Sequence, residues 1–208
     1  MKNSTDVKVM LKEAGILFAI TLIAGLVLGF VYELTKEPIR LQQEKAIQEA
    51  CAKVFVGASS FEAMEYTVPE GEMTAELSGM GVKIGRVYEA KGTAGERLGY
   101  VIETTSSEGY GGNIVLYVGV TLDGMVNDVS ILTIAETPGL GMKAEDELVP
   151  QFHQKPAGTF SVTKSGSVSE MEIDAISGAT VTTDAFTNAV NGAIRVYENL
   201  MQGGGSNE

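Results

Sequence analysis

Residues 113–134, NIVLYVGVTLDGMVNDVSILTI, decide the fold class of this chain. Two runs rich in β-branched and aromatic residues flank LDG, and the Asp123-Gly124 pair is a strong signal for a tight hairpin turn. A second pair of such runs, VKIGRVYEA at 82–90 and RLGYVIETT at 97–105, flanks the turn-like KGTAGE. Two consecutive hairpins predict a largely antiparallel sheet.

Helical patterns lie before and after these strands. Pro38 opens PIRLQQEKAIQEACAKVFVG, whose apolar spacing predicts a helix to about Phe55, closed by Gly57. Residues 58–81 show no clear period, and AEDELVPQF at 144–152 predicts a short helix. At 182–201 six apolar residues fall on one helical stripe: Phe186, Val190, Ala193, Ile194, Tyr197 and Met201. We therefore expect an α+β domain whose sheet is covered by helices.

The N-terminal region contains a long apolar run. Nineteen residues at 14–32, AGILFAITLIAGLVLGFVY, carry no charge, and as a helix they would cover the roughly 30 Å of hydrocarbon in a bilayer. A cleavable signal peptide is the competing interpretation. Its apolar core usually runs only about 7–15 residues and ends at a small-x-small site, which FVYELTKEP represents poorly. We expect a retained transmembrane helix that contacts the lipid bilayer through residues 14–32.

The charges beside this run do not orient it. Three basic residues precede the run and three follow it, so the positive-inside rule gives a tie. These residues are Lys2, Lys8 and Lys12 before it, and Lys36, Arg40 and Lys45 after it.

The rest of the chain is strongly acidic. Residues 1–60 hold seven Lys/Arg against six Asp/Glu, whereas residues 61–208 hold eight against twenty-one. Nucleic-acid affinity rests largely on Lys and Arg that displace counterions from the phosphate backbone. We therefore expect no nucleic-acid partner.

Cys51 is the single cysteine and His153 the single histidine of the 208 residues. An iron–sulfur cluster, a zinc site and an intramolecular disulfide each need more such residues than the chain contains. No metal site is expected, and any chemistry must use oxygen atoms, the backbone or an organic cofactor. His153 lies in the polar context QFHQK, which predicts a surface position.

Three glycine-containing segments are candidate ligand loops: EGYGGN at 108–113, ETPGLGMK at 136–143 and DAISGAT at 174–180. Glycine permits close backbone approach to a ligand, although each segment alone is more typical of a structural turn. GLGMKA at 139–144 only weakly matches the dinucleotide fingerprint. Pro138 disturbs its first turn, the neighbouring strands are predicted to be antiparallel, and no parallel strand–helix–strand unit carries an acidic residue at the expected distance.

Pairs of acidic residues suggest acid–base chemistry only weakly. Asp174 with Glu172, and Glu136 with Asp146, are such pairs, but a domain this acidic contains many by chance. We expect a solvated face instead. Ser177 has no evident triad partner, so no catalytic residues are predicted.

DAISGAT differs from the other two segments because it precedes the last predicted helix. Thr180 lies two residues before the expected N-cap region, where unsatisfied N–H groups and the helix dipole favour an anion. A phosphate esterified to the Thr180 hydroxyl would have room beside Gly178 and Ala179. The hydroxyls of Ser177, Thr182 and Thr183 could then donate hydrogen bonds to it.

DAISGAT resembles the flavinylation motif of a family of FMN-binding domains, found in the G subunit of the Rnf complex and the C subunit of the sodium-pumping NADH:quinone oxidoreductase. ETPGLG at 136–141 is similar to a second family segment that borders the flavin, and the layout of one anchor before an α+β domain matches as well. The chain length is closer to the Rnf member. The resemblance implies FMN linked covalently, through a phosphoester, to Thr180, and installed by a flavin transferase that uses FAD.

The resemblance also supplies candidates around the flavin. Ser177, Gly178, Ala179, Thr182 and Thr183 are candidates around the phosphate. Candidates near the ring are Thr137, Gly139, Leu140, Gly141 and Lys143, with Tyr110 a weaker candidate for stacking that is equally typical of a core aromatic. Asp174 is a candidate for recognition by the transferase.

By the same resemblance, this chain is an electron-carrier subunit of a complex that oxidises ferredoxin, reduces NAD and exports Na⁺ or H⁺. The other Rnf subunits are its expected partners, and its domain lies outside the cytoplasmic membrane. The chain alone is expected neither to bind NAD nor to pump ions. Its anchor contains no charged residue that could line an ion path. The expected regions are an N-terminal segment with the transmembrane helix (1–35), a juxtamembrane helical linker (36–60), the FMN-binding domain (61–201) and a disordered tail (202–208).

Two other functions stay open at this point. A membrane-tethered binding module would use SGAT only as a turn before a helix. An exterior flavoprotein could pass electrons to acceptors other than Rnf subunits.

Overall fold

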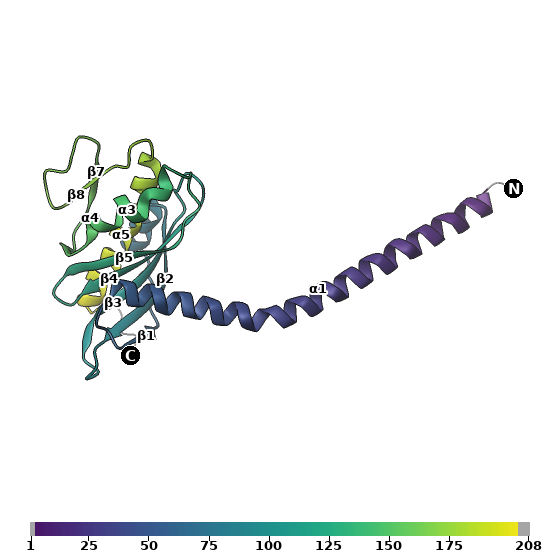
Figure 1. The fold of residues 1–208 in the computed structure, drawn as a ribbon, viewed down its shortest axis with the longest axis horizontal. Coiled ribbons are helices and arrows are strands. Elements are labelled where there is room, and N and C mark those ends of the chain that lie inside the picture. Colours follow the sequence, from purple (N-terminus) through teal and green to yellow (C-terminus); the bar gives the residue numbers. More distant parts are fainter. Residues whose placement is uncertain (1–2, 204–208) are drawn as a thin grey trace. The chain divides into compact units, whose positions relative to one another are not determined.

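The computed structural model describes the backbone of residues 3–203 and the side chains of residues 8–203 (Figure 1). It forms two compact units, residues 1–45 and 46–208. Of the tail expected to be disordered, Gln202 and Gly203 belong to the turn that closes the last helix, and residues 204–208 lie outside the described range. The four region boundaries expected from the sequence stay predictions.

Helix α1 (Asn3–Val54) runs without interruption through Pro38. The separate helix expected to start at Pro38 is therefore a continuation of the apolar helix. Proline lacks an N–H group, but good helix formers on both sides preserve the turns around it. An 18-residue window of this helix has a mean hydropathy of 2.6, so the helix is long and apolar enough to cross a membrane.

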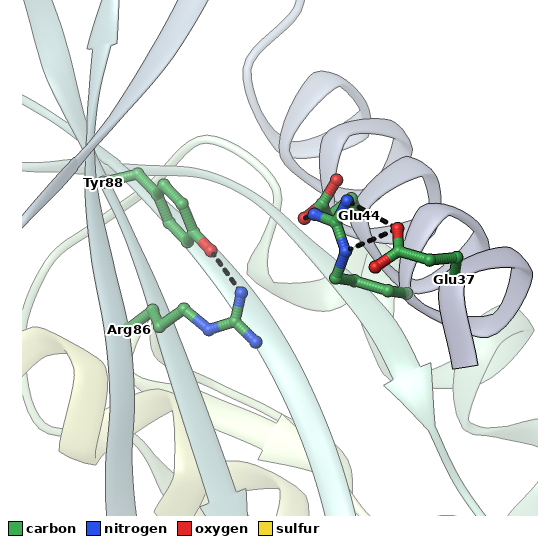
Figure 2. Close-up of polar contacts among 5 residues, drawn as sticks. Glu37, Glu44, Arg86 and Tyr88 are labelled. Atoms are coloured by element: carbon green, nitrogen blue, oxygen red, sulfur yellow. Dashed lines mark hydrogen bonds and ion pairs between the residues drawn. The ribbon is translucent and has the colours of Figure 1, made fainter. Parts of the chain in front are cut away.

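An arginine is paired with two glutamates on α1. Arg40 lies between Glu37 and Glu44, with nitrogen–oxygen distances of 2.9 and 2.7 Å (Figure 2). These i,i+3 and i,i+4 pairs stabilise a helix by only a few tenths of a kcal/mol each. They help to continue the helix just after Pro38.

Six strands form the main sheet in the order β1-β2-β3-β4-β5-β6, and every neighbouring pair is antiparallel. The strands are β1 (Ser60–Met64), β2 (Val82–Lys91), β3 (Arg97–Ser106), β4 (Ile114–Thr121), β5 (Met125–Thr133) and β6 (Lys155–Pro156). Both predicted hairpins are confirmed, including the tight turn at Asp123-Gly124. The predicted α+β fold with a mainly antiparallel sheet is confirmed.

Helix α5 (Thr180–Met201) covers one face of the sheet (Figure 1). Alternate residues of β4, among them Leu116 and Val118, point into the core that α5 closes. Five residues of the predicted apolar stripe are buried there, and Met201, the last residue of the helix, is half exposed. The amphipathic pattern therefore predicted the packing of α5 except at its end.

The last turns of α1 cover the opposite face of the same sheet. Ile47, Ala50, Cys51, Val54 and Phe55 pack there against residues of β2, β3 and β4. Two glycines allow this close approach. A Cβ on Gly119 would lie 2.7 Å from the carbonyl oxygen of Val54, and one on Gly99 would lie 2.6 Å from the ring of Phe55.

The side chain of Asn127 caps the C-terminus of α1 at this face. Its amide nitrogen donates a hydrogen bond of 2.6 Å to the carbonyl oxygen of Val54. The last carbonyls of a helix have no partner within the helix, so this bond satisfies a group that would otherwise lack one. The chain then leaves the helix through Gly57, whose φ is +99°.

A polar cluster lies on the face that α1 covers. The hydroxyl of Tyr117 donates to Glu103 at 2.7 Å. Arg86 donates to the hydroxyl of Tyr88 at 3.4 Å (Figure 2). Burial, followed by the contact with Glu103, raises the pKa of Tyr117 far above its ordinary value. This tyrosine therefore stays protonated and acts as a donor.

The sequence did not indicate several short elements. Residues 58–81 contain β1 and helix α2 (Glu72–Gly79), and a small parallel pair is formed by β7 (Ser161–Thr163) and β8 (Glu172–Asp174). The single helix expected at 144–152 is divided into α3 (Ala144–Glu147) and α4 (Val149–Phe152), preceded by the 3₁₀ turn η1 (Gly141–Lys143). Pro150 accounts for the break, because proline favours the first turn of a new helix.

The buried thiol of Cys51 gives a testable consequence. Burial, with a smaller effect of Glu103, raises its pKa to about 12, so at pH 8 only about 10⁻⁴ of the thiol is ionised. We expect iodoacetamide to leave the native full-length protein unmodified at pH 8 and to alkylate it once in urea, as measured by intact mass. Val56 is 86% exposed, so V56C should gain one alkyl group in the native state. Rapid native alkylation of Cys51 itself would contradict its buried position.

Candidate functional site

A cavity of about 520 Å³ opens at the start of α5. Pockets for small ligands and cofactors usually measure about 300–1,000 Å³. Three segments far apart in the sequence supply its walls, and each contains one of the predicted glycine loops. The lining residues are Tyr110, Glu136, Thr137, Leu140, Gly141, Gly178, Ala179, Thr180, Val181 and Thr182.

The ETPGLG segment forms one wall as a tight turn. The carbonyl oxygen of Thr137 accepts hydrogen bonds from Leu140 N at 3.1 Å and Met142 N at 3.3 Å. Gly139 has a φ of +77°, which the third position of a type II turn requires, and Pro138 occupies the second position that proline prefers. Pro138 is therefore part of the turn chemistry of this loop.

The DAISGAT segment turns just before α5. Ala179 N donates to the carbonyl oxygen of Ile176 at 2.9 Å, and Gly178 takes a φ of +78° inside this turn. The buried hydroxyl of Thr183 accepts from Ile176 N at 3.1 Å and donates to the carbonyl oxygen of Ala179 at 3.0 Å. One threonine side chain therefore fixes the whole loop onto the helix.

Thr180 is the first residue of α5, two positions earlier than the sequence suggested. Its side chain is partly exposed and lines the cavity. Ala179 is the N-cap and makes no side-chain capping bond, so the first backbone N–H groups of the helix have no capping side chain. The start of α5 therefore offers donors and a positive dipole end to an anion next to the Thr180 hydroxyl.

Asp174 is held at the end of β8 by Gln151. Gln151 accepts from Asp174 N at 2.7 Å and donates to the carbonyl oxygen of Asp174 at 3.2 Å. One carboxylate oxygen of Asp174 accepts from Ser167, and within residues 8–203 the other oxygen is buried with no hydrogen-bond partner. Asp174 does not line the cavity, and its predicted role in recognition stays a prediction.

Sequence analysis missed two residues of the cavity, Val181 and the buried acid Glu136. We expected it on a solvated face, but it is only 6% exposed. Its two oxygens accept from Gly111 N at 3.1 Å and from the hydroxyl of Thr182 at 2.9 Å. The one sequence signal at Glu136 is its position directly before the Pro138-Gly139 turn.

Eight of the twelve predicted cofactor residues line the cavity: Tyr110, Thr137, Leu140, Gly141, Gly178, Ala179, Thr180 and Thr182. Four lie elsewhere. Ser177 and Gly139 are exposed on the turns. Lys143 is half exposed and pairs with Glu147 at 3.2 Å. The Thr183 hydroxyl is engaged in hydrogen bonds to the backbone of its own loop. Tyr110 is 77% exposed, so it is not the core aromatic that the sequence left open.

The remaining sequence candidates lie outside the cavity. Asp146 is exposed, and Glu172 accepts a hydrogen bond from Val168 N at 2.7 Å. His153 lies at the surface as predicted, with 56% of its side chain exposed, 3.4 Å from Asp128.

The cavity offers two kinds of surface to a ligand. Polar groups cluster at the helix start around Thr180, whereas Tyr110, Leu140 and Val181 contribute exposed apolar atoms to the walls. Such a division suits a ligand with a phosphate at one end and a flat, largely apolar ring system at the other. The donor set and the cavity volume therefore fit a flavin mononucleotide.

A substitution at Gly141 should disturb this wall. A Cβ there would lie 2.7 Å from both the Glu136 Cβ and the Thr182 hydroxyl oxygen, and neither can move without loss of their hydrogen bond. We expect Gly141→Ala to lower the free energy of unfolding by about 1–3 kcal/mol. Urea unfolding of the full-length protein in detergent, followed by circular dichroism, measures this. Gly79→Ala is the matched control, because a Cβ at Gly79 meets nothing within 4 Å. Equal stabilities of the two variants would contradict the close packing at Gly141.

Two family profiles match the chain. The profile of the FMN-binding domain matches residues 109–195, which include all ten cavity residues, and that of the RnfG N-terminal region matches residues 1–54.

Curated relatives match along nearly the full length. The chain is 34% identical over 207 residues to the G subunit of the Na⁺-translocating ferredoxin:NAD⁺ oxidoreductase complex of Acetobacterium woodii, covering 97% of this chain and 98% of that one. It is 32% identical over 191 residues to the G subunit of the proton-translocating complex of Clostridium ljungdahlii, covering 88% and 92%. The crystal structure of Shewanella oneidensis NqrC aligns with a TM-score of 0.48 at 19% identity, covering 72% and 74%. The chain therefore belongs to the RnfG family, the G subunits of the ion-translocating ferredoxin:NAD⁺ oxidoreductase complexes, with an FMN-binding domain after its N-terminal helix.

Proposed function

We propose that this chain is a membrane-anchored electron carrier of a ferredoxin:NAD⁺ oxidoreductase complex that exports Na⁺ or H⁺, and that it holds FMN covalently on Thr180. The observation that carries the proposal is the cavity at the start of α5, with Thr180 in its wall. Bound FMN supplies one- and two-electron transfer, which no side chain of this chain provides. The other subunits of the complex are the partners.

The residues of the cavity divide the work of holding FMN. The free N–H groups at the start of α5 bind the phosphate, aided by the helix dipole. Gly178 and Ala179 leave room beside it, and the apolar walls at Leu140 and Tyr110 receive the ring. Because the Thr183 hydroxyl already has two partners, we assign this residue to fixing the loop and not to the phosphate.

The attachment step uses the Thr180 hydroxyl as the nucleophile. A flavin transferase brings FAD, a new bond forms between the Thr180 oxygen and the phosphorus of the FMN half, and the pyrophosphate bond to AMP breaks. The hydroxyl proton leaves and AMP departs. Thr180 is partly exposed, so a transferase can reach it.

A covalent bond prevents the loss of the cofactor from a carrier outside the cytoplasmic membrane. A freely dissociating flavin in that location would be lost by dilution, whereas an esterified one stays. We propose this location for residues 46–208, with residues 14–32 of α1 in the lipid bilayer.

The attachment site is tested by flavin fluorescence. We expect full-length protein coexpressed with a flavin transferase to give a fluorescent band on a denaturing gel, and Thr180→Val to give a dark one. Loss of the single acceptor hydroxyl removes all covalent flavin. Ser177→Ala is the matched control, because that nearby hydroxyl lies outside the cavity and its loss should leave the band fluorescent. A fluorescent Thr180→Val band would move the attachment to another residue.

The orientation is tested with single cysteines in a Cys51→Ala background. Val168 is 91% exposed in residues 46–208, and Met10 is 67% exposed on the other side of the apolar run. In intact cells, a membrane-impermeant maleimide should label Val168→Cys, whereas Met10→Cys should be labelled only after permeabilisation. The reverse pattern would place the FMN-binding domain in the cytoplasm.

A further inference from the structure

Glu136 is a buried acidic side chain at the point where the three cavity segments meet. It follows β5 closely, belongs to the ETPGLG turn and lines the cavity. Its two oxygens reach the other two segments, the 108–113 loop through Gly111 N and helix α5 through Thr182. One carboxylate therefore joins all three segments.

The surrounding main chain encloses this carboxylate closely. A Cβ on Gly109 would lie 2.8 Å from one carboxylate oxygen, and a Cβ on Gly111 would lie 2.0 Å from the carbonyl oxygen of Ala135. On the other side, a Cβ on Gly141 would lie 2.7 Å from the Glu136 Cβ. The glycines of two loops are thus required for the backbone to approach Glu136.

Glu136 has no cationic partner among the side chains of residues 8–203. Lys143 lies on the same loop but pairs with Glu147. A buried carboxylate without an ion pair carries a desolvation cost that two hydrogen bonds only partly offset. A glutamine could form hydrogen bonds to the same two partners without that desolvation cost, so the charge itself calls for an explanation.

We propose that Glu136 is a positioning residue that holds the 108–113 loop against the start of α5, and that its charge lowers the reduction potential of the flavin in the cavity. The second half rests on the proposed function. Reduction adds electrons to the flavin, and a nearby negative charge in a region of low dielectric makes this less favourable. The cavity would thereby hold a flavin that gives up electrons more readily.

The positioning half is tested on protein that lacks flavin, expressed without the transferase. Glu136→Ala removes both hydrogen bonds, so we expect amide hydrogen exchange to quicken at least tenfold in peptides covering 108–113 and 179–183. Exchange in the β4 strand should stay as in the wild type, which shows that the variant is folded. Glu145→Ala, at an exposed site on α3, is the control and should change neither segment. Unchanged exchange of the 108–113 loop in Glu136→Ala would overturn this half.

The electrostatic half is tested with Glu136→Gln in the flavin-loaded, full-length protein. The amide keeps the shape, can accept from Gly111 N and can donate to the Thr182 oxygen, so flavin per chain should stay within twofold of the wild type. We expect a positive shift of the flavin midpoint potential in a spectroelectrochemical titration, with no shift for Glu145→Gln. An unchanged potential in loaded Glu136→Gln would overturn this half.

The two proposals fail in different ways. Wild-type protein without any flavin would end the proposed function and the electrostatic half with it, whereas the exchange experiment would still decide the positioning half. Thr182→Val and Thr182→Ser add a check on geometry. Only the first removes the hydroxyl that Glu136 accepts from, so faster exchange near residue 182 should appear in Thr182→Val and be absent in Thr182→Ser.

Discussion

The cavity depends on the two hydrogen bonds of one buried carboxylate. Glu136 accepts from the backbone of the 108–113 loop and from the first turn of α5, segments that are 25 and 46 residues away along the chain. Hydrogen bonds to a charged group contribute about 1.5–3 kcal/mol each, more than neutral ones. The three loops consist mainly of small residues and have few apolar side chains that could pack together, so these two hydrogen bonds hold them in place. The walls of the cavity are therefore held together by hydrogen bonds to a charged group, whereas the rest of the domain is held together by apolar packing.

That apolar packing is provided by a sheet that is covered on both faces. Helix α5 closes the larger core, and the last turns of α1 close the smaller one, where two glycines and Asn127 receive the end of the helix. The loops that follow β3 and β5 therefore start from strands of this covered sheet, and the loop before α5 follows β8 of the small parallel pair. Functional loops are often carried on a rigid scaffold. The packed scaffold fixes the ends of the loops, so less conformational entropy is lost when the loops are ordered.

The sequence predicted those parts of the structure that depend on local pattern. The hairpins at 82–105 and 113–134 and the stripe of α5 follow from alternation, turn residues and helical period, which neighbouring residues alone determine. Elements decided by tertiary contacts were missed. β1 and α2 have no strong period, and β6 has only two residues that pair with β5. The uninterrupted α1 was also missed, since Pro38 is a strong local signal for a helix start.

In the candidate site, too, residues marked by a local motif were predicted and those defined by tertiary contacts were not. Thr180 and the glycines of the loops were predicted from the motif and its resemblance to a family, and the cavity brings most of them together. Thr183 could not be separated from the other hydroxyls, because its partners are backbone groups that face it only after the turn at Gly178 has formed. Glu136 could not be distinguished from the many acidic residues of the chain, because its burial arises from segments remote in sequence.

The place of Thr180 at the very start of α5 has a consequence for how the protein matures. The first position of a helix tolerates many residues. The Thr180 side chain takes no part in the hydrophobic core or in the hydrogen bonds of Glu136. If FMN is attached at Thr180 as proposed, the fold does not depend on the attachment, and the chain can fold before it is loaded. On the proposed function, a cell short of riboflavin would accumulate folded subunits that cannot carry electrons, and proteases that degrade misfolded proteins would leave them intact.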